Sequence, residues 1–147
     1  MYNTPTRTRE HAFYSQGYNC YYCKCRMWSG DPIRFCSEYG LTLRQASSFR
    51  LTAEHVVARC DGGSNAPSNI VAACSRCNRL RHARKRPMPA PQFAAYVRRR
   101  VQRGGWHELD AIRAGLVEPT RGCQRGNRCQ RTQAKKKAPH GHLPIAT

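Results

Sequence analysis

Acidic side chains and long apolar runs are both scarce in this chain. Its 147 residues include only 8 Asp and Glu against 26 Lys and Arg, a formal net charge of +18. No apolar run is long enough to cross a bilayer, and residues 1–9 show no apolar segment of the kind a secretory signal needs. We therefore predict a cytoplasmic protein with no membrane partner. The mean hydropathy of −0.75 indicates a thin core that needs additional stabilisation.

The excess of positive charge points to a polyanionic partner. Lys and Arg that approach phosphates release condensed counterions, so a strongly basic domain is typical of nucleic-acid binding. A generic solubilising charge is the alternative. The charge thus predicts a partner and says little about the fold.

Nine cysteines contrast with this polar composition, and four of them form two matched pairs. Cys20 and Cys23 enclose two residues, and so do Cys74 and Cys77. In a reducing compartment such pairs are more often metal ligands than disulfides, and four thiolates are a common tetrahedral zinc set. Reduced, buried cysteines are the alternative. Cys25 lies too close to Cys23 for a usual pair, and a second ion on Cys123 and Cys129 is a weaker option.

The distribution of motifs predicts four segments: a flexible lead-in (1–18), a compact domain with the motifs (19–87), a helical extension (88–118) and a basic, disordered tail (119–147). Within the compact domain we expect a strand over 50–57, a loop over 59–68, a strand over 69–73 and a helix from Cys74 that ends before Pro87. Shorter helices are expected over 41–49, 92–103 and 106–114.

The order of these motifs resembles the HNH endonuclease family. The matching elements are the first Cys-x-x-Cys pair, Glu54-His55-Val56-Val57, Gly62-Gly63, Asn69-Ile70-Val71 and Ala73-Cys74-x-x-Cys77-Asn78. They cover about residues 19–86. The resemblance implies an α+β protein with a small zinc-stabilised ββα-metal core and flanking helices, which cleaves DNA with one divalent cation, Mg²⁺ or Mn²⁺.

The resemblance also implies roles for individual residues. His55 is the expected general base, since an imidazole can take a proton from water near neutral pH. Glu54, at a position where the family usually has Asp or His, is expected to bind the cation, together with Asn78 and His82 on the following helix. Asn69 is expected to hold the loop between the strands. A bulge or twist in the first strand would let Glu54 and His55 act on one phosphate.

The implied reaction is in-line attack of water on phosphorus, which leaves 5′-phosphate and 3′-hydroxyl ends. The expected partner is double-stranded DNA, gripped by six basic residues on or just after the helix: Arg76, Arg79, Arg81, Arg84, Lys85 and Arg86.

Several alternatives stay open. A zinc-stabilised nucleic-acid-binding module without catalysis and a ribosome- or RNA-associated zinc protein both fit the charge and the cysteines. Phage, homing and restriction roles, in a bacterium or a phage-infected host cell, are equally compatible with a nuclease. The sequence does not indicate one-strand or two-strand cleavage, a preferred cutting site or an oligomeric state.

Overall fold

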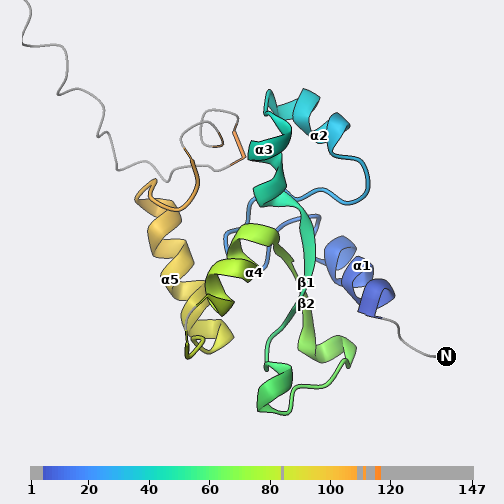
Figure 1. Cartoon of the computed structure of the whole chain (residues 1–147), viewed down its shortest axis with the longest axis vertical. Coiled ribbons are helices and arrows are strands. Elements are labelled where there is room, and N and C mark those ends of the chain that lie inside the picture. Colours follow the sequence, from blue (N-terminus) through green and yellow to red (C-terminus); the bar gives the residue numbers. More distant parts are fainter. Residues whose placement is uncertain (1–4, 84, 109–110, 112–114, 117–147) are drawn as a thin grey trace, which may run out of the picture.

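The computed structural model describes residues 5–83, 85–108, 111 and 115–116 (Figure 1). The fold is α+β, as predicted. Its longer elements are α1 (Pro5–Ser15), α2 (Pro32–Tyr39), α3 (Leu43–Ala46), β1 (Leu51–His55), β2 (Ile70–Cys74), α4 (Ser75–His82) and α5 (Ala90–Gln102). Within the described residues, every helix is too short or too polar to traverse a lipid bilayer.

The centre of the fold is a hairpin followed directly by a helix. β1 and β2 pair antiparallel in a regular register that runs from Leu51 opposite Cys74 to His55 opposite Ile70. Cys74 ends β2 and caps α4, with its sulfur accepting a hydrogen bond from the backbone N–H of Cys77. This β1–β2–α4 unit is the predicted ββα arrangement. Figure 1 shows α1 and α4 on opposite sides of the hairpin.

An aromatic core joins the hairpin to the later helices. Tyr22, Phe49 and Phe93 are almost fully buried. The rings of Tyr22 and Phe93 meet edge to face, with their centroids 4.9 Å apart, and Trp106 meets Phe93 in the same way at 6.0 Å. Such edge-to-face pairs add attraction beyond the area that they bury. The core therefore fixes α5 and the residues after it against the ββα unit.

The N-terminal prediction was wrong, because Pro5–Ser15 form helix α1 where a flexible lead-in was expected. α1 packs against both strands and buries Ala12 and Phe13. Just after it, the Gln16 side chain bonds the backbone N–H and the carbonyl of Ala72, each at 2.9 Å. The helix buries few apolar residues, so its sequence has no apolar periodicity from which a helix could be predicted. α2 also went unpredicted, although Asp31 caps its start and Gly40, with φ 61°, ends it.

The remaining boundaries differ by a few residues from the predictions. The strand expected over 50–57 is three residues shorter in the structure, and the strand expected over 69–73 is shifted by one residue. The helix expected to end before Pro87 ends at His82. α5 matches the helix expected over 92–103 closely. The segment expected as helix over 106–114 is described only in part. The tail over 119–147, with Cys123 and Cys129, lies outside the described residues.

The loop between the strands is folded back on itself around Asn69. The Asn69 amide accepts from the Val57 N–H at 2.8 Å and donates to the carbonyls of Val57 and Ser64 at 3.0 and 2.8 Å. Gly63 lies so close to the Val57 backbone that a Cβ atom would be 1.9 Å from the Val57 carbonyl oxygen. The loop thus has one compact conformation that admits no side chain at position 63.

Gly63→Ala should destabilise the protein by about 1–3 kcal/mol, the usual cost of overpacking, because backbone must move to admit the methyl group. Urea unfolding measures this change. Gly105→Ala is the matched control, since its Cβ would lie 3.5 Å from the flexible Arg100 side chain. Equal stability losses in the two variants would contradict this description of the loop.

Candidate functional site

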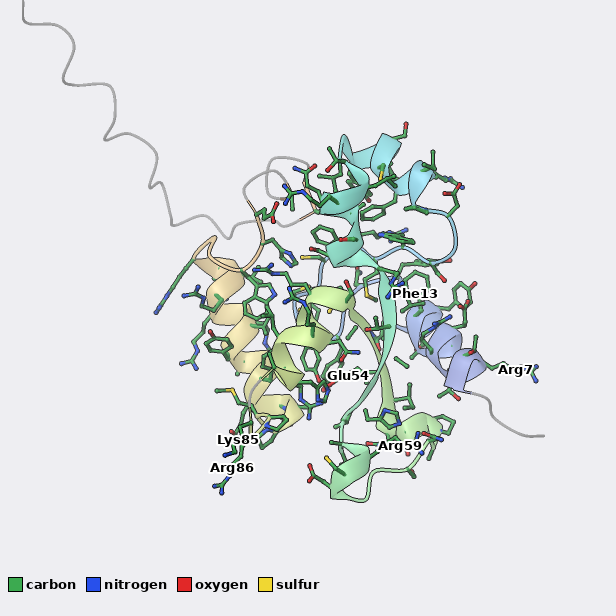
Figure 2. The ribbon with its side chains drawn as sticks, viewed as in Figure 1. Arg7, Phe13, Glu54, Arg59, Lys85 and Arg86 are labelled. Carbon is green, nitrogen blue, oxygen red and sulfur yellow. The ribbon has the colours of Figure 1, made fainter. Side chains whose placement is uncertain are left out.

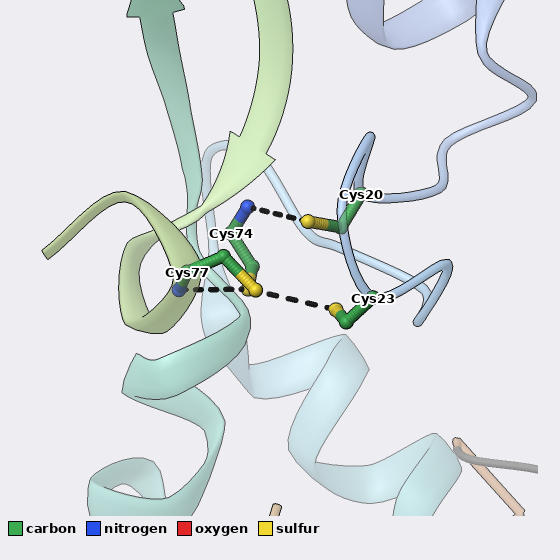
Figure 3. Close-up of side chains that lie close together, drawn as sticks. All are labelled: Cys20, Cys23, Cys74 and Cys77. Atoms are coloured by element: carbon green, nitrogen blue, oxygen red, sulfur yellow. Dashed lines mark hydrogen bonds between the residues drawn. The ribbon is translucent and has the colours of Figure 1, made fainter. Parts of the chain in front are cut away.

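Four cysteines from distant parts of the chain meet in the interior. The sulfur atoms of Cys20, Cys23, Cys74 and Cys77 all lie within 4.8 Å of one another, and all four residues are buried (Figure 3). The sulfurs of Cys23 and Cys74 are 3.8 Å apart. Tetrahedral zinc with Zn–S bonds of ~2.3 Å places its sulfurs about 3.8 Å apart. The four thiols predicted from their spacing therefore come together in a cluster that could hold a metal ion, with a geometry that fits zinc.

Hydrogen-bond donors surround these sulfurs. The Cys74 N–H points at the Cys20 sulfur at 3.3 Å, and the Trp106 indole N–H points at the Cys77 sulfur at 3.3 Å. Burial disfavours the Cys20 thiolate, but hydrogen bonds from the other three cysteines outweigh burial and lower the Cys20 pKa well below its usual value. Hydrogen bonding to Cys20 raises the pKa values of Cys23 and Cys74 well above normal, and burial does so for Cys77. Without an ion the set therefore favours a single thiolate, and a bound cation would displace the remaining protons.

Cys25 and His107 lie beside this centre. Their ligand atoms fall within 4.8 Å of each other and of the Cys23 sulfur. Burial lowers the pKa of His107 to about 4, so the imidazole is neutral, and its ring stacks on Phe49. Among the described residues, the four-cysteine set offers four ligands and the group of Cys23, Cys25 and His107 offers three, so the four-cysteine set is the better candidate for a tetrahedral metal site.

Glu54 is the second notable group, because it is an almost completely buried acid in a chain with few acids. Only 1% of the residue is exposed. Its Oε1 accepts hydrogen bonds from the Arg81 guanidinium and from the Tyr22 hydroxyl, the latter at 3.0 Å. A buried carboxylate without such partners would cost several kcal/mol. Arg81 and Tyr22 therefore make the buried position of Glu54 possible.

Arg81 contacts more than Glu54. The guanidinium also donates to the backbone carbonyls of His55 at 2.8 Å, Val56 at 2.9 Å and Met88 at 3.1 Å. The residue is 3% exposed. This corrects the prediction that Arg81 grips DNA phosphates, because its donors are occupied inside the protein. Arg81 instead ties α4 to the end of β1.

The second carboxylate oxygen of Glu54 faces His82. Oε2 lies 3.1 Å from His82 Nε2, which is also 3.3 Å from Oε1, and the His82 side chain is 39% exposed. Two ligands at right angles on a cation with bonds of ~2.1 Å are about 3 Å apart. The pair therefore fits two adjacent positions of a divalent cation, on the solvent side of the buried network. Figure 2 shows Glu54 between the hairpin and α4.

His55 lies on the other face of β1. Pairing stays regular through Glu54 and His55, so the strand has no bulge there and the two side chains alternate. His55 Nε2 lies 2.9 Å from Asn65 Oδ1 in the interstrand loop. If the ring donates from Nε2, its Nδ1 is left as the basic nitrogen. Asn65 falls in the segment expected as a loop, and nothing in the local sequence marks it as a partner of His55.

The two predicted asparagines are placed differently from each other. Asn69 holds the loop between the strands through its hydrogen bonds to Val57 and Ser64. Asn78 donates to the Thr52 hydroxyl at 3.0 Å and to the Ala53 carbonyl at 3.1 Å. These bonds hold the Asn78 side chain against the backbone and hydroxyl of β1. Asn78 was predicted to bind the cation with Glu54, but no described hydrogen bond joins the two. Of the residues expected to bind the cation, Glu54 and His82 come together.

The other predicted DNA-binding residues are mixed in exposure. Arg79, Lys85 and Arg86 are exposed. Arg76 is half-buried and donates to the Trp106 carbonyl at 2.7 Å. Arg84 lies outside the described residues. Figure 2 shows Lys85 and Arg86 after α4, and Arg59 in the loop after β1. Arg59 is exposed and was not among the predicted contacts.

One comparison with known proteins gave a match. Residues 44–84 match the family model described as HNH endonuclease. No curated protein and no solved structure matches the chain. The matched range contains Glu54, His55, Asn69, the second cysteine pair and His82, and it excludes the first cysteine pair with Tyr22.

Cys77→Ser should lose bound zinc and unfold, because one thiolate of four is removed from a buried centre that supports a thin core. His55→Ala should keep its zinc and its melting temperature. Zinc analysis and thermal melting of the purified chains measure both. Equal zinc content and equal melting of Cys77→Ser and the unchanged chain would contradict a structural role for the centre.

Arg81→Met should lower the free energy of unfolding by about 3–5 kcal/mol, because it leaves the buried Glu54 carboxylate without its cationic partner. The double variant Glu54→Gln/Arg81→Met should recover part of this loss. Arg79→Met, at an exposed position of the same helix, is the control and should change stability by less than about 0.5 kcal/mol. Urea unfolding that ranks Arg79→Met with Arg81→Met would refute the assigned pairing.

Proposed function

With an HNH endonuclease segment at residues 44–84 as the premise, we propose that this chain is a metal-dependent endonuclease that hydrolyses DNA phosphodiester bonds. The observation that carries the proposal is the Glu54–His82 pair, 3.1 Å apart at the surface of a buried network. A carboxylate and an imidazole at this separation suit a divalent cation such as Mg²⁺ or Mn²⁺. The four thiols suit a separate, structural zinc ion.

Glu54 Oε2 and His82 Nε2 are the residues that would hold the catalytic cation. When bound there, a divalent cation supplies positive charge for the charge that develops on the phosphate and on the leaving 3′-oxygen. Arg81 and Tyr22 donate hydrogen bonds to the other carboxylate oxygen, Oε1. Two protein ligands leave the remaining positions to water and phosphate.

His55 serves as the general base of the proposed reaction. The Asn65 carbonyl oxygen can accept from Nε2–H, which leaves Nδ1 to take the proton of the attacking water. Because His55 is the last residue of β1, a DNA backbone that crosses this end of the strand can reach both of its faces. Arg81 holds the backbone carbonyl of His55, which fixes the base relative to Glu54.

Exposed cations flank this end of the hairpin. Arg59 follows β1, while Lys85 and Arg86 follow α4, so each group lies close in sequence to His55 or His82 (Figure 2). Phosphate contacts from such residues position a duplex and carry no sequence information. We therefore propose double-stranded DNA as substrate, bound across the ends of β1 and α4. Phage, homing and restriction roles fit this chemistry equally.

A non-catalytic, zinc-stabilised DNA-binding module is the second candidate. One observation favours it: within the described part of the chain, no hydrogen bond joins His55 to the Glu54–His82 pair, and β1 has no bulge to turn both side chains to one side. A module that only binds would need the thiol centre and the basic surface, but not His55.

Plasmid cleavage distinguishes the two candidates. The unchanged chain should nick or linearise supercoiled plasmid with Mg²⁺ or Mn²⁺, and EDTA should stop the reaction. His55→Ala and His82→Ala should each lower the cleavage rate at least a hundredfold, because they remove the base and a cation ligand. Gel shifts should show that both variants still bind DNA.

Cys60→Ser is the matched control, since Cys60 is an exposed loop residue close to this end of β1. It should cleave like the unchanged chain. If the unchanged chain shifts DNA but leaves supercoiled plasmid intact with every metal, the binding module is the correct reading. If His55→Ala cleaves at the normal rate, the assigned base is wrong.

A further inference from the structure

We propose that Tyr22, from within the first cysteine pair, is a positioning residue that keeps one oxygen of Glu54 available to the catalytic cation. The inference rests on the proposed function, because it concerns the same cation site. Tyr22 lies outside the matched residues 44–84, and it makes the thiol centre part of the arrangement that presents Glu54.

The Tyr22 hydroxyl comes from a segment that the thiol centre fixes at both ends. Tyr22 lies between Cys20 and Cys23, and the backbone N–H of Tyr21 bonds the Ala72 carbonyl on β2 at 2.9 Å. The residue is completely buried, and its ring meets Phe93 edge to face. The hydroxyl therefore has little freedom, and it points at Glu54 Oε1 from 3.0 Å.

The phenol acts as a donor. The Glu54 carboxylate can only accept, so the Tyr22 O–H is the donor of their hydrogen bond. Oε1 thus accepts from two donors, the phenol and the Arg81 guanidinium. Oε2 has His82 as its partner, and His82 Nε2 lies nearer to Oε2, at 3.1 Å, than to Oε1, at 3.3 Å.

Without the phenol, this division of the two oxygens would change. A guanidinium and a carboxylate favour a two-bond fork in which both oxygens are engaged. The Tyr22 hydroxyl competes for Oε1 from a fixed direction, and the Arg81 donors are shared with the carbonyls of His55 and Val56. Removing the hydroxyl frees the carboxylate to rotate toward Arg81, which would turn Oε2 away from His82 and the cation.

Tyr22→Phe tests this directly. The variant retains the ring that packs on Phe93 and loses only the hydroxyl. The zinc-loaded full chain is titrated with Mn²⁺, and free Mn²⁺ is followed by electron paramagnetic resonance. We expect a dissociation constant about tenfold higher than that of the unchanged chain, as for other residues that orient metal ligands. Zinc content should stay the same, and plasmid cleavage should recover at saturating Mn²⁺.

Tyr21→Phe is the matched control. It lies in the same cysteine pair, and its ring contacts Tyr22 with centroids 5.2 Å apart. It should leave Mn²⁺ affinity unchanged. In an Arg81→Lys background, Tyr22→Phe should change Mn²⁺ affinity less than twofold, because a lysine cannot form the two-bond fork. This double-variant comparison separates steering of Arg81 from a general loss of packing.

The outcomes separate this inference from the proposed function. If the unchanged chain binds Mn²⁺ at His82 and cleaves DNA, but Tyr22→Phe binds Mn²⁺ as tightly as Tyr21→Phe, the role of Tyr22 is refuted and the nuclease stands. If Tyr22→Phe weakens Mn²⁺ binding equally in the unchanged chain and in the Arg81→Lys background, the role of Tyr22 is also refuted. If the unchanged chain neither binds Mn²⁺ nor cleaves DNA, the proposed function fails, and the role of Tyr22 fails with it.

Discussion

The meeting of four cysteine thiols from distant parts of the chain is the contact on which the rest of this structure depends. Cys23 and Cys74 lie 51 residues apart in the chain and 3.8 Å apart in space. The contact places the first cysteine pair against the start of α4, and with it Tyr22 against Glu54. A chain with a thin apolar core would gain folding free energy from a cation held there, because the ion would bind the folded arrangement only.

The second constraint is electrostatic. Glu54 is one of 8 acidic residues in a chain of net charge +18, and it is buried. Its carboxylate spans two environments: Oε1 accepts from Arg81 and Tyr22 inside the protein, and His82, near the surface, lies 3.1 Å from Oε2 and 3.3 Å from Oε1. This division satisfies a buried charge and still leaves one oxygen for a cation. Stability and the proposed chemistry therefore use the same side chain.

Local sequence patterns predicted the β1–β2–α4 unit and the four-cysteine set, because fixed spacings within short segments determine them. They failed where a role depends on distant partners. α1 is held by Gln16 and the hairpin, and it lacks an apolar stripe. In the sequence, Arg81 resembles the other arginines of its helix, but in the structure it donates hydrogen bonds to the carbonyls of His55 and Val56. Tyr22 and Asn65 acquire partners only when the chain folds.

Anomalous diffraction from crystals grown with Zn²⁺ and Mn²⁺ tests the central claim most directly. Data collected on either side of the zinc edge distinguish the two metals. The account predicts one zinc peak equidistant from the sulfurs of Cys20, Cys23, Cys74 and Cys77, and one manganese peak shared by Glu54 Oε2 and His82 Nε2. Zinc at another position, or a Glu54 carboxylate that binds Arg81 through both oxygens with no manganese beside it, would contradict the account.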